Sequence, residues 1–234
     1  MKLRITTLTV LIGLAWPSWA QTQSVAPRTA PKAVQQDPSL ARIANDPKLP
    51  RVLLIGDSIS MGYTIPVRHL LKGKANVHRI PENGGPTTNG LAQLQKWLGD
   101  GKWDVIHFNW GLHDLKIMAG GKRQVPPEEY EKNLGELVRR LKATGANLIW
   151  ASTTPVPVGK LNPPRDPADV PAYNAIAARI MDENKIAIDD LYGFALPQLA
   201  KIQRPENVHF TTEGSEILAK PVAASIESAL ARRR

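Results

Sequence analysis

The sequence predicts an α/β fold with a mostly parallel sheet, and three observations support this. From residue 50 onward, five short apolar runs alternate with segments of helical length. Polar turn residues follow the apolar runs and mark where each one ends. The connecting segments are long enough to carry the chain back across a sheet, which places successive strands parallel to one another.

The five apolar runs predict the strands. The first is the clearest, because it reads Arg-Val-Leu-Leu-Ile directly before Gly56, and the second is the weakest. Runs of this kind are typical of strands buried on both faces of a sheet. The predicted strands cover residues 51–55, 76–80, 103–110, 147–152 and 186–188.

Six segments predict helices, and the segment 126–143 has the strongest signals. Pro126 and Pro127 open it, acidic residues fill its first turn and basic residues its last, in agreement with the helix dipole. Gly145 then ends it. A Pro-rich loop over 155–167 precedes the next helix. The predicted helices cover residues 59–72, 87–98, 126–143, 169–184, 190–202 and 212–231.

Residues 1–20 have the pattern of a secretory signal peptide. Lys2 and Arg4 precede an apolar run over 5–16, and Ser18-Trp19-Ala20 resembles a small-x-small cleavage site. The alternative, a membrane anchor, needs about 20 apolar residues. We therefore expect export to a bacterial periplasm or to the outside of the cell, without stable membrane insertion.

The rest of the chain divides into two parts of different composition. Residues 21–48 carry several Pro residues among Gln, Ala, Ser and Thr without an apolar period, which predicts a flexible lead-in. Residues 49–234 predict one domain, because this length supports a single core but hardly two.

Composition excludes several classes of function. The chain has no cysteine, which excludes disulfides, thiolate metal sites and Cys nucleophiles. The net charge is +9, but five positive charges lie in residues 1–20 and the C-terminal 232–234, which leaves +4 for the remainder. No basic stripe with interleaved aromatic residues is present, so we expect no nucleic-acid partner. The oligomeric state stays open.

Four polar segments are the candidates for a functional site. Ligands of parallel α/β sheets bind beyond the carboxyl ends of the strands. Three of the segments directly follow predicted strands, and the fourth precedes the last helix, so the fold brings them to one edge of the sheet. They cover residues 56–60, 83–88, 111–114 and 206–210.

In order and spacing, these segments resemble the motif blocks of the SGNH hydrolases, a branch of the GDSL esterases. The Gly-Asp-Ser that ends at Ser58 matches the nucleophile block, and Gly85 matches the glycine block. Two later blocks depart from the family pattern, since His113 replaces its Asn and Glu206 replaces its Asp. The resemblance covers about residues 50–230. It implies a flavodoxin-like, three-layer α/β/α sandwich with a five-stranded parallel sheet.

The resemblance also implies a serine-hydrolase mechanism. Ser58 would be the nucleophile, with His209 as its general base and Glu206 orienting that histidine. The chain order nucleophile, acid, base is a known one. The backbone N–H groups of Ser58 and Gly85 and the side chain of His113 would hold the oxyanion. An imidazole N–H can donate as an amide does, with a pH dependence that Asn lacks.

Neighbouring residues have supporting roles in this interpretation. Asp57 can bond local amides, and Asp114 can cap its turn or hold His113. As alternatives, His113 contacts the substrate, or Asn109 supplies the oxyanion amide. A metal site built from Asp57, His113, Asp114 and His209 is a further alternative, although their spacing matches no metal signature. We expect no cofactor.

The implied reaction is acyl transfer from an ester to water. Export and the small domain favour O-deacetylation of a carbohydrate, and Trp110 beside the site can stack on a sugar face. The alternative is a lysophospholipase or short-chain lipid esterase. From other classes, the two departures can mark a glycan-binding domain that no longer hydrolyses, or the chain can be a secreted structural protein. We interpret His69, His78 and His107 as structural.

Overall fold

A five-stranded sheet forms the middle layer of the computed structural model, which describes residues 37–232. The strand order is β2-β1-β3-β4-β5, and each neighbouring pair is parallel. This confirms the predicted α/β fold with a five-stranded parallel sheet. The strands are β1 (Arg51–Ile55), β2 (Asn76–Arg79), β3 (Val105–Phe108), β4 (Asn147–Ala151) and β5 (Ala187–Asp189).

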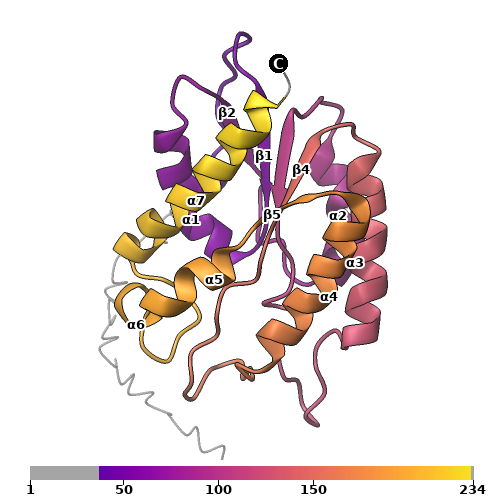
Figure 1. Ribbon diagram of the computed structural model, residues 1–234, viewed down its shortest axis with the longest axis vertical. Helices are drawn as coiled ribbons and strands as arrows, with labels where there is room; N and C mark the ends of the chain where they lie inside the picture. Colours follow the sequence, from indigo (N-terminus) through magenta and orange to yellow (C-terminus); the bar gives the residue numbers. More distant parts are fainter. Residues whose placement is uncertain (1–36, 233–234) are drawn as a thin grey trace, which may run out of the picture. The chain divides into compact units, whose positions relative to one another are not determined.

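Helices cover both faces of the sheet (Figure 1). On one face, α1 (Ser58–Leu70) and α7 (Thr212–Ala231) pack side by side, and on the other lie α2 (Thr87–Leu98), α3 (Pro127–Lys142) and α4 (Asp169–Asn184). The side chains of β3 are all fully buried between these layers. Burial on both faces explains why the residues of β1 and β4 are apolar in succession rather than in alternation.

One predicted helix is broken in the structure. In place of a helix over 190–202, the chain forms α5 (Leu191–Ala195), a 3₁₀ turn (Leu196–Gln198) and α6 (Leu199–Ile202). Pro197 lies within the 3₁₀ turn. Its nitrogen cannot donate to the carbonyl four residues earlier, so a continuous α-helix would lack a backbone hydrogen bond at this point.

Part of the predicted lead-in is held against the domain. Residues 38–40 form a 3₁₀ turn with Ser39 buried. The Arg68 guanidinium of α1 donates to the carbonyl of Ala41 at 3.1 Å, and the Asn76 amide donates to the carbonyl of Asp46 at 2.9 Å. Residues 37–48 of the predicted lead-in therefore make defined contacts with α1 and β2. Residues 1–36, with the predicted signal peptide, lie outside the described residues.

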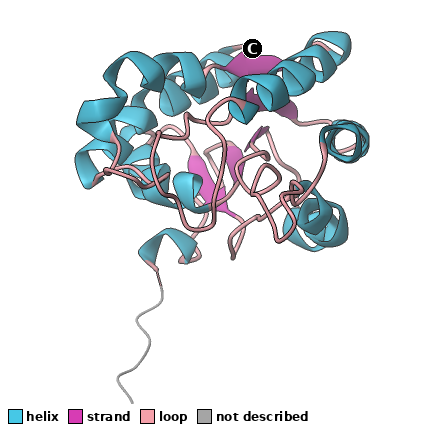
Figure 2. Cartoon of the chain, turned by 90° about the horizontal axis from the view of Figure 1, so that it is seen from below, coloured by secondary structure: helices cyan, strands magenta, loops and turns pink. Residues whose placement is uncertain are grey.

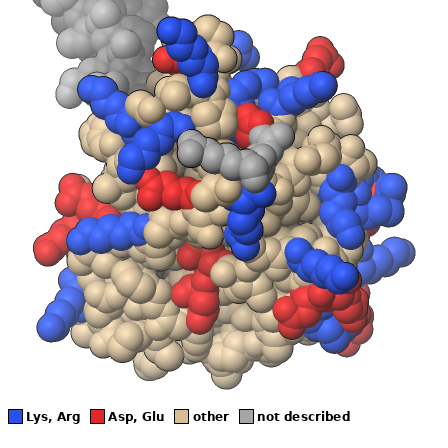
Figure 3. Space-filling view, turned by 45° about the horizontal axis from the view of Figure 1, so that its top comes forward, with Lys and Arg blue, Asp and Glu red and all other residues tan. Residues whose placement is uncertain are grey.

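The loops that follow the strands gather at one end of the sheet, which Figure 2 shows from below. In the view of Figure 3, Lys and Arg side chains are scattered among acidic and uncharged ones. None of the helices within residues 37–232 combines the length and apolar character that a membrane crossing needs.

Candidate active site

Ser58 begins helix α1 directly after strand β1. The Asp57 carboxylate caps the helix by accepting from the N–H of Ile59 at 2.9 Å, so Asp57 has the supporting role predicted for it. As the first helical residue, Ser58 has an N–H with no acceptor inside the helix. Both its backbone donor and its hydroxyl are therefore presented at the helix N-terminus, where negative charge is stabilised.

The structure brings Ser58 and His209 together across the sheet edge. The Oγ of Ser58 lies 2.8 Å from Nε2 of His209, although 151 positions separate them in the sequence. His209 lies in the loop that precedes α7, and the Gln203 amide holds this loop by donating to the carbonyls of Pro155 and Val208. A serine at this distance from an imidazole can pass its proton to the ring as it attacks.

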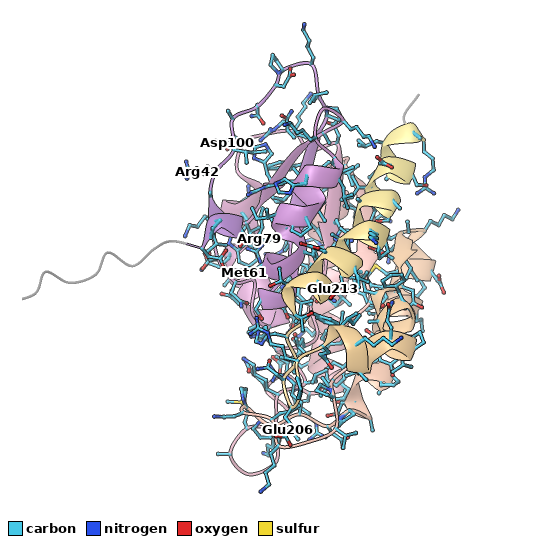
Figure 4. All side chains as sticks on the ribbon, turned by 90° about the vertical axis from the view of Figure 1, so that its left-hand side faces the viewer. Arg42, Met61, Arg79, Asp100, Glu206 and Glu213 are labelled. Atoms are coloured by element: carbon cyan, nitrogen blue, oxygen red, sulfur yellow. The ribbon has the colours of Figure 1, made fainter. Side chains whose placement is uncertain are left out.

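Asn207, and not Glu206, holds the other nitrogen of His209. Nδ1 of His209 donates to Oδ1 of Asn207 at 2.7 Å, and the same oxygen accepts from the His209 backbone N–H at 2.9 Å. Glu206 is exposed at the tip of the loop with φ of 47° and lies against Gly159. Figure 4 shows it among the loops at the lower end of the molecule. The prediction that Glu206 orients His209 is therefore wrong in this geometry.

The sequence contains a signal for Asn207 that the family pattern concealed. An Asn side chain commonly accepts from the backbone N–H two residues later, and His209 stands two residues after Asn207. The turn aims the amide oxygen at both nitrogens of one residue. This arrangement fixes the tautomer that leaves Nε2 free to accept the Ser58 proton.

Variants of this loop should separate the two candidates. We expect Asn207→Ala to lower kcat for an activated ester roughly 10- to 100-fold, because the ring loses its orientation and tautomer. The matched change Glu206→Ala should stay within about twofold, since an exposed carboxylate without a catalytic partner contributes little. Steady-state kinetics of both variants decide which residue orients His209. A larger loss of kcat in Glu206→Ala than in Asn207→Ala would assign this role to Glu206.

The pH dependence of kcat/KM should report His209. Burial, followed by the positive charges of Arg204 and Arg165, lowers the pKa of His209 below its ordinary value of 6.5, against an opposing effect of Asp57. The base form therefore persists to lower pH, and the acid limb of kcat/KM should be centred below 6.5. Asn207→Asp should move this limb upward, because a carboxylate stabilises the imidazolium. A wild-type limb above 6.5 would contradict the assignment.

Two of the predicted oxyanion donors are already engaged. The N–H of Gly85 donates to the Oδ1 of Asn83 at 2.9 Å. The Asn109 amide donates to the carbonyl of Ala151 at 2.8 Å and to Oγ1 of Thr153 at 3.1 Å, so both of its hydrogens are in use. Asn109 thus ties the ends of β3 and β4 together and has no free amide hydrogen, which leaves the alternative oxyanion role without support.

His113 keeps a donor that can serve an oxyanion. Its Nδ1 lies 2.9 Å from Nζ of Lys116, and its Nε2 has no hydrogen-bond partner within residues 37–232. Burial lowers the pKa of His113 to about 4. The ring is therefore neutral at ordinary pH. The replacement of Asn by His was expected to make the oxyanion donor depend on pH, and well above a pKa of about 4 this dependence is absent.

Asp114 anchors the loop after β3 to helix α2, and among the described hydrogen bonds none joins its carboxylate to the His113 ring. Its Oδ1 accepts from the backbone N–H of Thr87 at 2.8 Å and from the Thr87 hydroxyl at 2.5 Å. The carboxyl group is fully buried, and its Oδ2 has no partner within the described residues. Burial raises its pKa to about 7 despite these hydrogen bonds.

Asp114 should make stability decline with rising pH. The unfolded carboxyl loses its proton near pH 4, whereas the folded one keeps it to about 7, so folding takes up a proton between these values. The difference corresponds to on the order of 4 kcal/mol. Asp114→Asn keeps the acceptor oxygen for Thr87 and removes the titration. Denaturant unfolding at several pH values should show a flatter profile for the variant, and an unchanged slope would contradict this origin.

Other residues considered for the site are structural. Trp110 is 1% exposed and packs beneath Gly90, where an added Cβ would lie 2.8 Å from its ring, so it cannot stack on a sugar. His107 is buried and its Nε2 lies 2.9 Å from Oδ2 of Asp189. Within residues 37–232, no three His, Asp or Glu side chains are arranged to hold a metal ion, so the four-residue metal alternative has no geometric support.

A groove of about 800 Å³ opens beside the Ser58–His209 pair, between α1 and α7. Its walls include the apolar side chains of Met61 and Ile65 on α1, and Lys220 lies on the α7 side. The position of Met61 on α1 can be followed in Figure 4. The groove has room for a substrate group larger than acetyl next to the nucleophile.

A helix-borne serine paired with a loop histidine at the carboxyl edge of a parallel α/β sheet defines a serine-hydrolase type of site. The sequence comparisons agree with this class. Residues 54–217 match the GDSL-like Lipase/Acylhydrolase family, and the chain belongs to that family. The matched region includes the nucleophile turn, the His113 loop and His209.

The individual proteins that resemble this chain share 30% or less of their aligned residues with it. An "Arylesterase" of Vibrio mimicus is 30% identical over 110 residues, which are 42% of this chain and 52% of that protein. The chain therefore spans about half the length of this curated relative. Among solved structures, a lipase/acylhydrolase from Enterococcus faecalis has a TM-score of 0.67 at 20% identity, covering 76% of this chain and 96% of that one. The acetylxylan esterase Axe2 from Geobacillus stearothermophilus has a TM-score of 0.64 at 19% identity, covering 76% and 94%.

Proposed function

We propose that this protein is an exported serine esterase that removes O-acetyl groups from a carbohydrate. The observation that carries the catalytic part is the 2.8 Å contact of Ser58 Oγ with His209 Nε2, in a ring whose Nδ1 is held by Asn207. Two solved structures with the same fold are acetylxylan esterases, and this supports the choice of substrate class. The signal-peptide pattern of residues 1–20 supports export.

The proposed reaction passes through an acyl-enzyme. Ser58 Oγ attacks the ester carbonyl as its proton passes to Nε2 of His209. The Ser58 N–H and the Nε2–H of His113 donate to the oxyanion of the tetrahedral intermediate. The intermediate collapses to the acyl-serine, and His209 returns its proton to the leaving alkoxide. Water then attacks the acyl-serine by the same route, which releases the acid and restores Ser58.

A lipid ester is the second candidate, and the groove beside Ser58 favours it. Apolar side chains of α1, including Met61 and Ile65, line the groove, and a hydrocarbon chain would bury apolar surface against them. The same groove also has polar side chains, including those of Arg204 and Glu216, to which the hydroxyl groups of a sugar can bond. The groove therefore makes chain length the property that discriminates between the candidates.

A substrate panel tests both candidates on the purified protein. The panel contains p-nitrophenyl acetate and octanoate, an acetylated xylo-oligosaccharide and a lysophosphatidylcholine. Preferential release of acetate from the oligosaccharide supports the deacetylase, whereas faster cleavage of the octanoate and the lysolipid favours the lipid esterase. Binding of the glycan by folded protein without any turnover would instead indicate the non-catalytic domain.

A further inference from the structure

Lys116 makes a direct contact with the imidazole of His113. The two residues belong to one turn after β3, in which the N–H of Lys116 donates to the carbonyl of His113 at 3.3 Å. The Nζ of Lys116 lies 2.9 Å from Nδ1 of His113, and both side chains are partly buried. Neither the family pattern nor the predicted site includes this lysine.

The chemistry of the two groups decides which atom donates. A lysine ammonium has three N–H donors and no lone pair, so the ring Nδ1 must accept. A neutral imidazole carries one hydrogen, and that hydrogen is then on Nε2. Because Nε2 has no hydrogen-bond partner within the described part of the chain, its N–H is free to donate to a ligand.

We propose that Lys116 is a positioning residue that fixes the tautomer of His113, so that Nε2–H serves as the oxyanion donor in place of the family's Asn amide. This inference rests on the proposed esterase function. An Asn presents its N–H donors in every protonation state, whereas a histidine can present either a donor or a lone pair. A fixed cation on Nδ1 removes this ambiguity from the histidine.

The surrounding charges act in the same direction. Burial is the largest cause of the lowered pKa of His113, and the positive charges of Lys116 and Arg165 add to it, as His209 does when it is protonated, whereas Asp57 opposes it. Arg165 is fixed beside the turn by donating through Nε to the carbonyl of Leu112 at 2.8 Å. The ring therefore stays neutral and keeps a single N–H.

Nitrogen NMR tests the tautomer without any substrate. In ¹⁵N-labelled protein at neutral pH, the His113 signals should show a protonated Nε2 and an unprotonated Nδ1, with His113→Asn providing the assignment. Lys116→Arg should keep this pattern, because a guanidinium also has only donors. Lys116→Glu should place the hydrogen on Nδ1, because a carboxylate accepts it. A wild-type ring with Nδ1–H, or one whose signals are the same in Lys116→Glu, would overturn the proposal.

Kinetics test the consequence for the reaction. At about pH 8, Lys116→Glu should lower kcat on the order of 100-fold with little change in KM, because the oxyanion loses a donor. As pH falls, part of this loss should be recovered, since a carboxylate partner favours the imidazolium, which carries N–H on both nitrogens. Lys116→Arg should remain within about threefold of wild type.

Two controls separate positioning from a general charge effect. Lys122→Met removes a positive charge from the same loop region, where Lys122 is exposed, and should change kcat by less than about twofold. In a His113→Asn background, Lys116→Glu should also have less than about a twofold effect, because no tautomer remains to be set. An equal loss in both backgrounds would overturn the proposal. Full activity in Ser58→Ala would instead overturn the proposed function, and the NMR result would stand separately.

Discussion

Replacing Ser58 with Ala is expected to lower kcat for p-nitrophenyl acetate by about 10⁴- to 10⁶-fold, and His209→Ala should have a similar effect. Serine is a weak nucleophile at neutral pH unless a base accepts its proton, and the 2.8 Å contact supplies that base. The double variant should be no worse than either single one, because each change disables the same proton transfer.

The matched control for these variants is Ser215→Ala. Ser215 lines the same groove from α7 but has no contact with His209 among the described hydrogen bonds. Its activity should remain within about threefold of wild type. Multiplicative losses in the double variant would show that Ser58 and His209 act separately, which would contradict the shared step.

Removal of the Arg79 guanidinium is expected to lower both the free energy of unfolding and the turnover. The group is buried at the end of β2, and its Nη2 donates to the carbonyls of Gly56 and Asp57 at 2.9 Å each. Its Nη1 donates to the carbonyls of Ile80 and Glu82 at 2.9 and 2.7 Å. One side chain therefore holds the backbone of the nucleophile turn and the start of the glycine loop.

Arg79→Met leaves several buried carbonyls without a donor. An unsatisfied buried acceptor costs about 1–3 kcal/mol, so we expect the free energy of unfolding to fall by about 3–5 kcal/mol in total. The loosened turn should also lower kcat roughly 10- to 100-fold, because small displacements of a nucleophile are costly. Denaturant unfolding and kinetics at a temperature where the variant is folded measure the two effects.

Arg68→Met is the control for the arginine prediction. Arg68 lies on α1 and donates to the carbonyls of Val77 and Ala41, away from the nucleophile turn. Its loss should lower stability but leave kcat within about threefold of wild type. If folded Arg79→Met keeps full kcat, Arg79 supports only the fold.

The sequence was a sufficient guide to the sheet and to the nucleophile. The apolar runs that became β1 and β4 are continuous because both faces of these strands are buried, and that property is visible without coordinates. Ser58 follows from its place after the first run. His209 follows from the order of the polar segments, and the structure brings it to Ser58.

The wrong site predictions concern loops, where the backbone conformation of a single residue decides which side chain reaches the site. Glu206 and Asn207 are adjacent, and the left-handed backbone of Glu206 turns the Asn side chain toward His209. No periodicity encodes such a turn. Trp110 stands next to the 111–114 segment in the sequence, which favours a sugar contact, but only packing shows that its ring lies under Gly90. Arg79 acts through contacts with residues 22 and 23 positions away, and Lys116 through the geometry of a turn, and a linear motif reports neither.

Labelling with a fluorophosphonate tests the central claim most directly, because the probe reacts with a serine whose proton a base has accepted. Intact-mass measurement of the folded protein should show one adduct per chain, and peptide mapping should place it on Ser58. Ser58→Ala should show no adduct, and His209→Ala should react at least about 100-fold more slowly. An adduct that persists in Ser58→Ala, or no adduct on folded wild-type protein, would contradict a nucleophilic serine activated by His209.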